Sequence, residues 1–154
     1  MYQSLMIYMH DFALMLIYDL HTVPIESLES KLYHLNQAFN VDYLYPHLSI
    51  NCYHKLALYY IKKDTDIAIN YLEKYCQCFD YLVVDFVYQK DEFFEGIDEW
   101  LNTLPLEGRL PANYENTLNI ICARILENEN FVTLDNFGYI KKKLLRIYNK
   151  KDEG

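Results

Sequence analysis

Apolar side chains recur at helical spacing through most of this chain, and this periodicity constrains its fold more than any other feature. One clear stripe consists of Leu28, Leu32, Leu35 and Phe39, which follow one another at steps of three and four residues. Such steps place the side chains on a single face of an α-helix. No segment shows a strand pattern with a plausible pairing partner elsewhere in the chain. The sequence therefore predicts an all-α fold of six to seven helices.

The starts of three predicted helices are marked by individual residues. Pro24 and Pro46 open helices that end near residues 40 and 62, because the fixed φ of proline suits a first helical turn. Asp64 caps the next helix, which we expect from residue 67 to about residue 78. The apolar run that follows, residues 79–89, loses the helical period and fits a continuation of that helix or a buried irregular connector better than an isolated strand. The remaining helices are predicted at residues 2–21, 91–104, 114–128 and 138–149, with a loop at residues 105–111.

The charge of the chain weighs against nucleic acid as a direct partner. The net charge is −8, whereas binding through phosphates requires a basic stripe. A local basic cluster does occupy the C-terminal segment between Lys141 and Lys151. Cations are favoured near a helix C-terminus by the helix dipole, so a structural role is the preferred interpretation. DNA binding through this tail stays open as an alternative.

The cysteines and the first apolar segment bear on localisation. Four cysteines occur without a recognisable secretory signal, which indicates reduced thiols in the cytoplasm. The apolar segment from Leu5 to Leu20 carries Asp11 near its centre, and a carboxylate inside a bilayer costs several kcal/mol. We therefore expect a cytoplasmic chain with no membrane association.

The first predicted helix is apolar on almost every side. One stripe would suffice to pack it against its own chain, yet a second side is apolar as well. This second side is formed by Ile7, Tyr8, Leu14, Met15 and Tyr18. A covering partner is then needed, and the sequence predicts a homodimer seam on this helix.

No catalytic, metal or cofactor motif stands out. His10 and Asp11 are adjacent and diverge on a helix, and Cys52 and His54 diverge in the same way, so neither pair has metal-ligand spacing. No glycine-rich turn accompanies a nucleophile. We expect no enzyme activity, no cofactor and no metal. A small metal- or thiol-dependent enzyme using the His and Cys residues of the first and third helices is the alternative.

A helical hairpin in the middle of the chain resembles a known repeat. Residues 53–60 carry Ala57 between tyrosines, a polar turn follows at residues 64–66, and residues 67–72 carry Ala68 with Tyr71 one turn later. Small residues allow two helices to approach closely, and the aromatic rings fill the space between pairs. This arrangement resembles the tetratricopeptide repeat, although the Gly and Pro common in that repeat are missing. The resemblance implies antiparallel hairpins in a right-handed array, with hairpins at residues 1–78 and a C-terminal helical lobe at residues 91–150 of one domain, residues 1–154.

A second resemblance covers the C-terminal part. The run at residues 91–101, the proline-flanked loop, the long helix after it and the Asn-Phe pairs before a lysine-rich helix are similar to the tail of Xre-type helix-turn-helix bacterial transcriptional regulators. The chain shows no helix-turn-helix segment before its repeat-like region. The resemblance therefore implies the sensor or oligomerisation part of a regulator-like protein, without its DNA-reading part.

A binding groove is predicted on the third helix. In arrays of helical hairpins the first helices of successive pairs line a concave face, and the side next to the buried stripe carries Asn51, His54, Lys55 and Leu58. An asparagine amide can donate to and accept from a peptide backbone. The sequence therefore predicts a non-catalytic regulatory or interaction domain that binds a peptide or protein on this face.

Overall fold

All regular structure in the described part of the chain is helical. The computed structural model describes residues 8, 15–16, 19–20, 22–84 and 114–152, and within them seven α-helices and a terminal 3-10 helix are found. They are α2 (Ile25–Phe39), α3 (Val41–Leu44), α4 (Pro46–Tyr60), α5 (Thr65–Val84), α7 (Tyr114–Leu126), α8 (Glu129–Val132), α9 (Phe137–Asn149) and η2 (Lys150–Asp152). The all-α prediction is confirmed for these residues.

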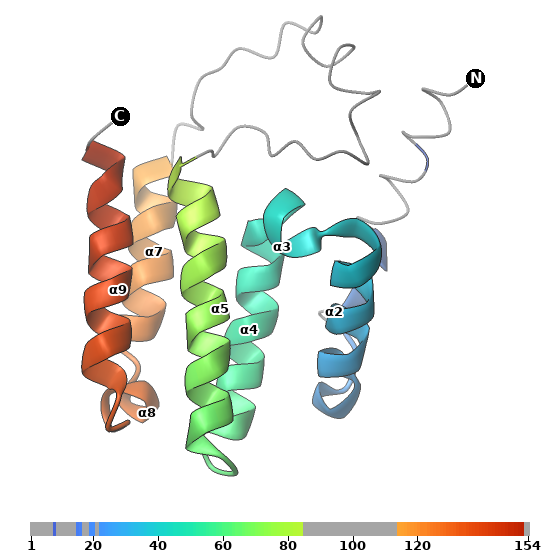
Figure 1. Cartoon of the computed structure of the whole chain (residues 1–154), viewed down its shortest axis with the longest axis horizontal. Helices are drawn as coiled ribbons and strands as arrows, with labels where there is room; N and C mark the ends of the chain where they lie inside the picture. Colours follow the sequence, from blue (N-terminus) through green and yellow to red (C-terminus); the bar gives the residue numbers. More distant parts are fainter. Residues whose placement is uncertain (1–7, 9–14, 17–18, 21, 85–113, 153–154) are drawn as a thin grey trace, which may run out of the picture.

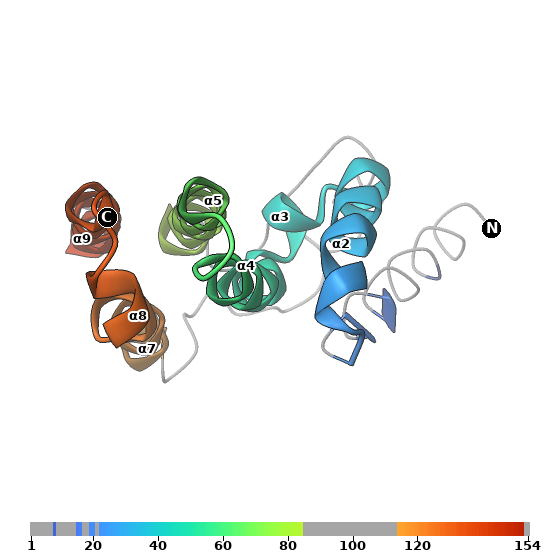
Figure 2. The same ribbon diagram turned by 90° about the horizontal axis from the view of Figure 1, so that it is seen from below.

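The long helices stand side by side in an elongated row. Figure 1 shows α2, α4, α5 and the α7–α9 pair with their axes roughly parallel, and α4 and α5 form an antiparallel hairpin. The view along the axes in Figure 2 places α2 near one end of the row and α9 at the other. In that view α4 and α7 lie on one side of the row and α5 and α9 on the other. Helices from both sides of the row contribute side chains to one buried apolar cluster.

The predicted helix starts agree with the structure. Pro24 directly precedes α2, and Pro46 is the first residue of α4. The side chain of Asp64 accepts hydrogen bonds of 3.1 Å from the backbone amides of Asp66 and Ile67. These amides belong to the first turn of α5 and have no partner inside the helix. Local chemistry alone was sufficient to place these three boundaries.

The end of α5 was predicted about six residues too early. The helix continues to Val84, and Phe79, Leu82 and Val83 are buried in its last turns. A helix that packs against neighbours on several sides is apolar on several faces, which removes the one-sided periodicity. Residues 79–84 of the apolar run therefore continue the helix, one of the two interpretations preferred for that run, whereas the end expected near residue 78 was wrong.

A short helix that the sequence did not predict separates α2 from α4. Asn40 ends α2 with φ of 47°, in the left-handed region that asparagine tolerates better than most residues. The chain then turns into α3, where Val41 is completely buried. The Asn36 side chain donates to Asp42 Oδ2 at 2.7 Å and accepts from the Asp42 amide at 3.0 Å. This paired contact holds the turn between the two helices.

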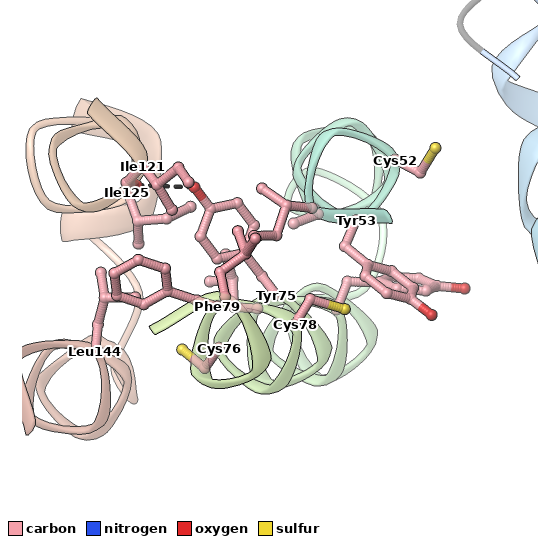
Figure 3. Packing of buried hydrophobic residues seen from close by; sticks show 14 of the residues in the cluster. Cys52, Tyr53, Tyr75, Cys76, Cys78, Phe79, Ile121, Ile125 and Leu144 are labelled. Atoms are coloured by element: carbon pink, nitrogen blue, oxygen red, sulfur yellow. Dashed lines mark hydrogen bonds between the residues drawn. The ribbon is translucent and has the colours of Figure 1, made fainter. Parts of the chain in front are cut away.

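One continuous apolar cluster connects the helices before residue 85 with those after residue 113. Phe79 and Tyr75 of α5 belong to the same buried cluster as Leu56 of α4 and Leu144 of α9. In Figure 3, Tyr75 points between α4 and α7, and its hydroxyl donates a 2.8 Å hydrogen bond to the backbone carbonyl of Ile121. Helix α5 is thus the central element, which packs against α4 on one side and against α7 and α9 on the other.

Several predicted elements lie outside the described residues. These are the helix at residues 91–104, the loop at residues 105–111 and most of the first helix, in which Tyr8, Met15, Leu16 and Asp19 are described and are helical. The helix predicted at residues 114–128 ends at Leu126, and the last helix spans Phe137–Asn149. Among the described helices, none is both long enough and apolar enough to cross a bilayer.

Candidate functional site

A groove opens between α2, α4 and α5, and it is here named the α2–α4–α5 groove. Its volume is about 360 Å³. Leu32 and Leu56 form a buried apolar floor, and Tyr53 and Tyr71 add aromatic surface. Tyr33 stands at its edge with 61% of its surface exposed. An apolar floor with polar groups at the rim is the usual composition of a protein binding site.

A glutamate held by two tyrosines lies on the α2 side of the groove. Tyr60 donates from its hydroxyl to Glu29 Oε2 at 2.7 Å, and Tyr71 donates to Glu29 Oε1. These two hydrogen bonds, with a smaller contribution from Lys74, lower the pKa of the Glu29 carboxyl below its usual value. Conversely, the bond to Glu29 raises the pKa of Tyr60 to about 12. Glu29 is therefore a fixed anion at neutral pH.

Tyr53 and Tyr71 form an aromatic wall of the groove, and the contact between α2 and α3 holds Tyr53 in place. Tyr53 donates from its hydroxyl to Asp42 Oδ2 at 2.5 Å, and Asp42 also receives the amide of Asn36 at 2.7 Å. The rings of Tyr53 and Tyr71 stack with centroids 6.0 Å apart. Burial, followed by the nearby Asp42 charge, raises the pKa of Tyr53. These contacts within the protein fix the position of the wall.

One cation faces the groove from α5. The Nζ atom of Lys74 lies 5.6 Å from the ring centroid of Tyr53 and 5.4 Å from that of Tyr71. Contact with the faces of aromatic rings stabilises an ammonium group. Glu26, one turn before Glu29 on α2, also lines the groove. Among the described residues that line it, the groove therefore has two carboxylates and one ammonium group, and no ion pair joins Glu29 to Lys74.

The residues predicted from the sequence lie on a different side of α4. Asn51 accepts a hydrogen bond from the Arg124 guanidinium of α7 and donates to the His47 carbonyl at 3.1 Å. The ring of His54 packs edge-on against Phe131 of α8, with centroids 5.8 Å apart. Lys55 is exposed, and Leu58 packs against the apolar core. The structure thus places Asn51 and His54 against α7 and α8, and the binding role of the four residues stays a prediction.

His54 has an unusual environment for an imidazole. Its Nε2 atom is buried and has no hydrogen-bond partner within the described residues. Burial, and then the charge of Arg124, lower the pKa of His54 to about 4. The neutral imidazole packs between Phe131 and Tyr75, so its surroundings are those of a core residue.

The four cysteines are all free and buried. Burial raises the pKa of Cys52 to about 11, of Cys76 to about 12 and of Cys122 to about 11, and it raises that of Cys78 as well. In Figure 3, Cys76 and Cys78 point to opposite sides of α5. Nucleophilic and metal-binding cysteines act as thiolates, and these environments oppose thiolate formation. In the described parts of the chain, no three His, Cys, Asp or Glu side chains are grouped so that they could hold a metal ion.

Part of the basic tail is neutralised by contacts within the protein. Lys150 pairs with Asp80 of α5 at 2.7 Å, and Lys151 pairs with Glu115 of α7 at 2.8 Å. Lys151 also lies 4.0 Å from the ring centroid of Tyr148. These contacts attach the end of the chain to α5 and α7, which agrees with the structural role preferred from the sequence.

Two residues of the predicted dimer seam are described. Tyr8 is 71% exposed and Met15 is 54% exposed. They are seven residues apart, so on a helix they share a face. Ile7, Leu14 and Tyr18 lie outside the described residues.

Comparison with known proteins gives no relative. No family model matches the chain, and neither a curated protein nor a solved structure does.

The α2–α4–α5 groove was not found from the sequence. Its residues come from three helices that the periodicity could not place relative to one another. Glu29 is one of two exposed acids on α2, and its partners Tyr60 and Tyr71 are 31 and 42 residues away. The number of tyrosines, 16 in 154 residues, was the available signal that such contacts exist.

Proposed function

We propose that this chain is a non-catalytic helical-repeat domain that binds a peptide or protein segment in the α2–α4–α5 groove. The observation that carries the proposal is the combination of a buried apolar floor with the exposed Tyr33 and the anchored Glu29 at the rim. Tyrosine contributes a large contact area at a small loss of conformational entropy. A wall that is already held in place also reduces the free energy lost in ordering upon binding.

The proposal includes a tetratricopeptide-like arrangement. The α4–α5 hairpin supports it, as does the alternation of α4 and α7 with α5 and α9 across the row in Figure 2. On this interpretation the chain is the sensor or oligomerisation part of a transcriptional-regulator-like protein. The buried, high-pKa thiols support a non-catalytic role over the thiol-enzyme alternative, because a catalytic thiol needs an accessible thiolate.

Selection from a random peptide library on the purified chain tests the proposed function. The selected peptides should bind wild type and lose about tenfold or more in affinity for Tyr33→Ala, the size of a typical aromatic hot spot. Tyr139→Ala is the matched control, because Tyr139 is 53% exposed on α9, away from the groove. Selection of no peptide, or equal losses for the two variants, would contradict the proposal. If the peptides instead lose affinity for Asn51→Ala, the binding surface is the side of α4 that was predicted from the sequence.

We also propose self-association through the first helix. The motivating observation is that Tyr8 and Met15, seven residues apart in the sequence, both expose apolar surface. Light scattering and sedimentation should give a dimer at micromolar concentration, and the double variant Tyr8→Glu, Met15→Glu should shift it to monomer. A wild-type monomer under these conditions would remove the dimer proposal and leave the peptide groove untouched.

A further inference from the structure

We propose that the α2–α4–α5 groove recognises an arginine or lysine side chain of its partner, and that Glu29 is the carboxylate that binds it. This inference rests on the proposed function, because it names the chemistry of the segment that the groove takes. It is carried by the geometry around Glu29, the charges of the groove and the aromatic surface beside them.

The first step is the unused hydrogen-bonding capacity of Glu29. An ionised carboxylate has about four acceptor positions, two on each oxygen. Tyr60 occupies one position on Oε2 and Tyr71 occupies one on Oε1. Within the described part of the chain two positions are therefore left, one on each oxygen, and Glu29 is solvent-exposed. Two parallel N–H groups are the donor set that fits one free position on each oxygen.

The second step is the orientation of the carboxylate. A free glutamate on a helix surface samples several rotamers and loses them when it forms an ion pair, which is why exposed pairs contribute little. The two hydroxyl groups hold Glu29 from α4 and α5, two helices other than its own. Because this ordering is already complete, a cation from outside gains more from Glu29 than from an unrestrained surface glutamate.

The third step is the charge balance. Glu26 and Glu29 give the groove two negative charges, and Lys74 supplies one positive charge. Lys74 lies over the rings of Tyr53 and Tyr71 and forms no ion pair with Glu29. The α2 side of the groove therefore keeps an excess of negative charge, and the whole chain carries −8. The negative excess in the groove and the negative net charge of the chain both favour a cationic partner. The net charge would repel an acidic one.

The fourth step distinguishes arginine from lysine. A guanidinium group is planar, so it can donate two parallel hydrogen bonds to a carboxylate and also stack on an aromatic ring. Tyr33, one helical turn after Glu29 on α2, offers an exposed ring at the same rim. A lysine ammonium is a point charge: it can approach the carboxylate and the ring face, but it has neither two parallel N–H groups nor a plane that stacks. We therefore expect arginine to bind more tightly than lysine.

Titration with small blocked amino acids, followed by amide NMR shifts, tests the inference. The probes are N-acetyl-arginine amide and its neutral isostere N-acetyl-citrulline amide, which differ in the charge of the end group. The arginine probe should shift amides near residues 26–33 and 71–74, and citrulline should bind about tenfold more weakly, as expected on losing a charge-assisted hydrogen bond. Equal binding of the two probes would overturn the inference.

Two variants locate the effect. Glu29→Gln should weaken arginine binding about tenfold, whereas Glu129→Gln, an exposed glutamate on α8, should leave it unchanged. Circular dichroism and the spectra of the free proteins establish that each variant is folded. An unchanged affinity in folded Glu29→Gln would refute the role of Glu29. Stronger shifts with N-acetyl-glutamate amide would also refute it, because Lys74 would then be the recognising group.

The library selection separates this inference from the proposed function. If the selected peptides bind in a Tyr33-dependent way but carry no excess of basic residues and are indifferent to Glu29→Gln, the groove binds peptides and the charge inference is wrong. If no peptide is selected, the proposed function is wrong, and the inference that rests on it is wrong as well. Basic peptides whose affinity falls in Glu29→Gln would support both.

Discussion

The hydroxyl of Tyr75 on α5 donates a 2.8 Å hydrogen bond to the backbone carbonyl of Ile121 on α7, inside the apolar core. The two bonded residues are 46 positions apart in the sequence. It also satisfies a buried hydroxyl and supplies a side-chain donor to a helix carbonyl. The packing of the C-terminal helices onto α5 therefore includes a directional contact inside the apolar core, in addition to the Lys150–Asp80 pair at the surface.

Replacing Tyr75 with phenylalanine removes this bond and keeps the ring. We expect the free energy of unfolding to fall by about 1 to 2 kcal/mol, the usual cost of deleting one partner of a buried hydrogen bond. Urea unfolding followed by circular dichroism measures the change. Tyr139→Phe is the control, since Tyr139 is largely exposed and should change stability by less than about 0.5 kcal/mol. Equal effects of the two variants would show that the bond adds nothing.

The left-handed conformation of Asn40 predicts that glycine at this position gives a more stable protein than alanine. Asn40→Ala should lower the free energy of unfolding by about 1 kcal/mol, because a Cβ-bearing residue without a local polar group disfavours φ of 47°. Asn40→Gly should be more stable than the alanine variant, since glycine adopts this region freely. Thermal unfolding of both proteins measures the order. Greater stability of the alanine variant would contradict the assigned turn.

His54 predicts a loss of stability in acid. Its pKa is lowered to about 4 in the folded protein, so between about pH 6.5 and 4 the unfolded chain binds the proton and the folded chain does not. The contribution is fully present above pH 6.5 and decreases as the pH falls towards 4. His54→Leu should remove this part of the pH dependence measured by urea unfolding. His34→Leu, at an exposed position on α2, should retain it; an unchanged slope in His54→Leu would contradict the prediction.

Tyr60 predicts a loss of stability in alkali that depends on Glu29. The bond to Glu29 raises the Tyr60 pKa to about 12, so the unfolded chain loses this phenolic proton near pH 10 and the folded chain keeps it to higher pH. The contribution is present below pH 10 and is lost as the pH rises towards 12. The phenolate absorbance of wild type should therefore appear at higher pH than that of Glu29→Gln. Tyr60→Phe controls for the other tyrosines, and coincident titration curves for wild type and Glu29→Gln would contradict the Glu29–Tyr60 contact.

Local signals predicted most of the described elements. The prolines before α2 and α4 and the Asp64 cap act within a few residues of their own positions, so their effects can be read directly from the sequence. The end of α5 was missed because burial on several sides removes periodicity. The helix α3 was missed because it depends on the contact between Asn36 and Asp42 across a turn.

By itself the sequence determined that this protein is helical and which faces are apolar, because helical period and capping are set by neighbours a few residues apart. Tertiary structure decided where the proposed binding groove lies. Glu29, Tyr60 and Tyr71 belong to three helices, and only their packing makes the glutamate a fixed anion at the rim of a groove. The same packing turned the Asn51 and His54 side of α4 towards α7 and α8. The choice between these two sides of α4 depends on the order in which the helices stack, and no local pattern in the sequence encodes that order.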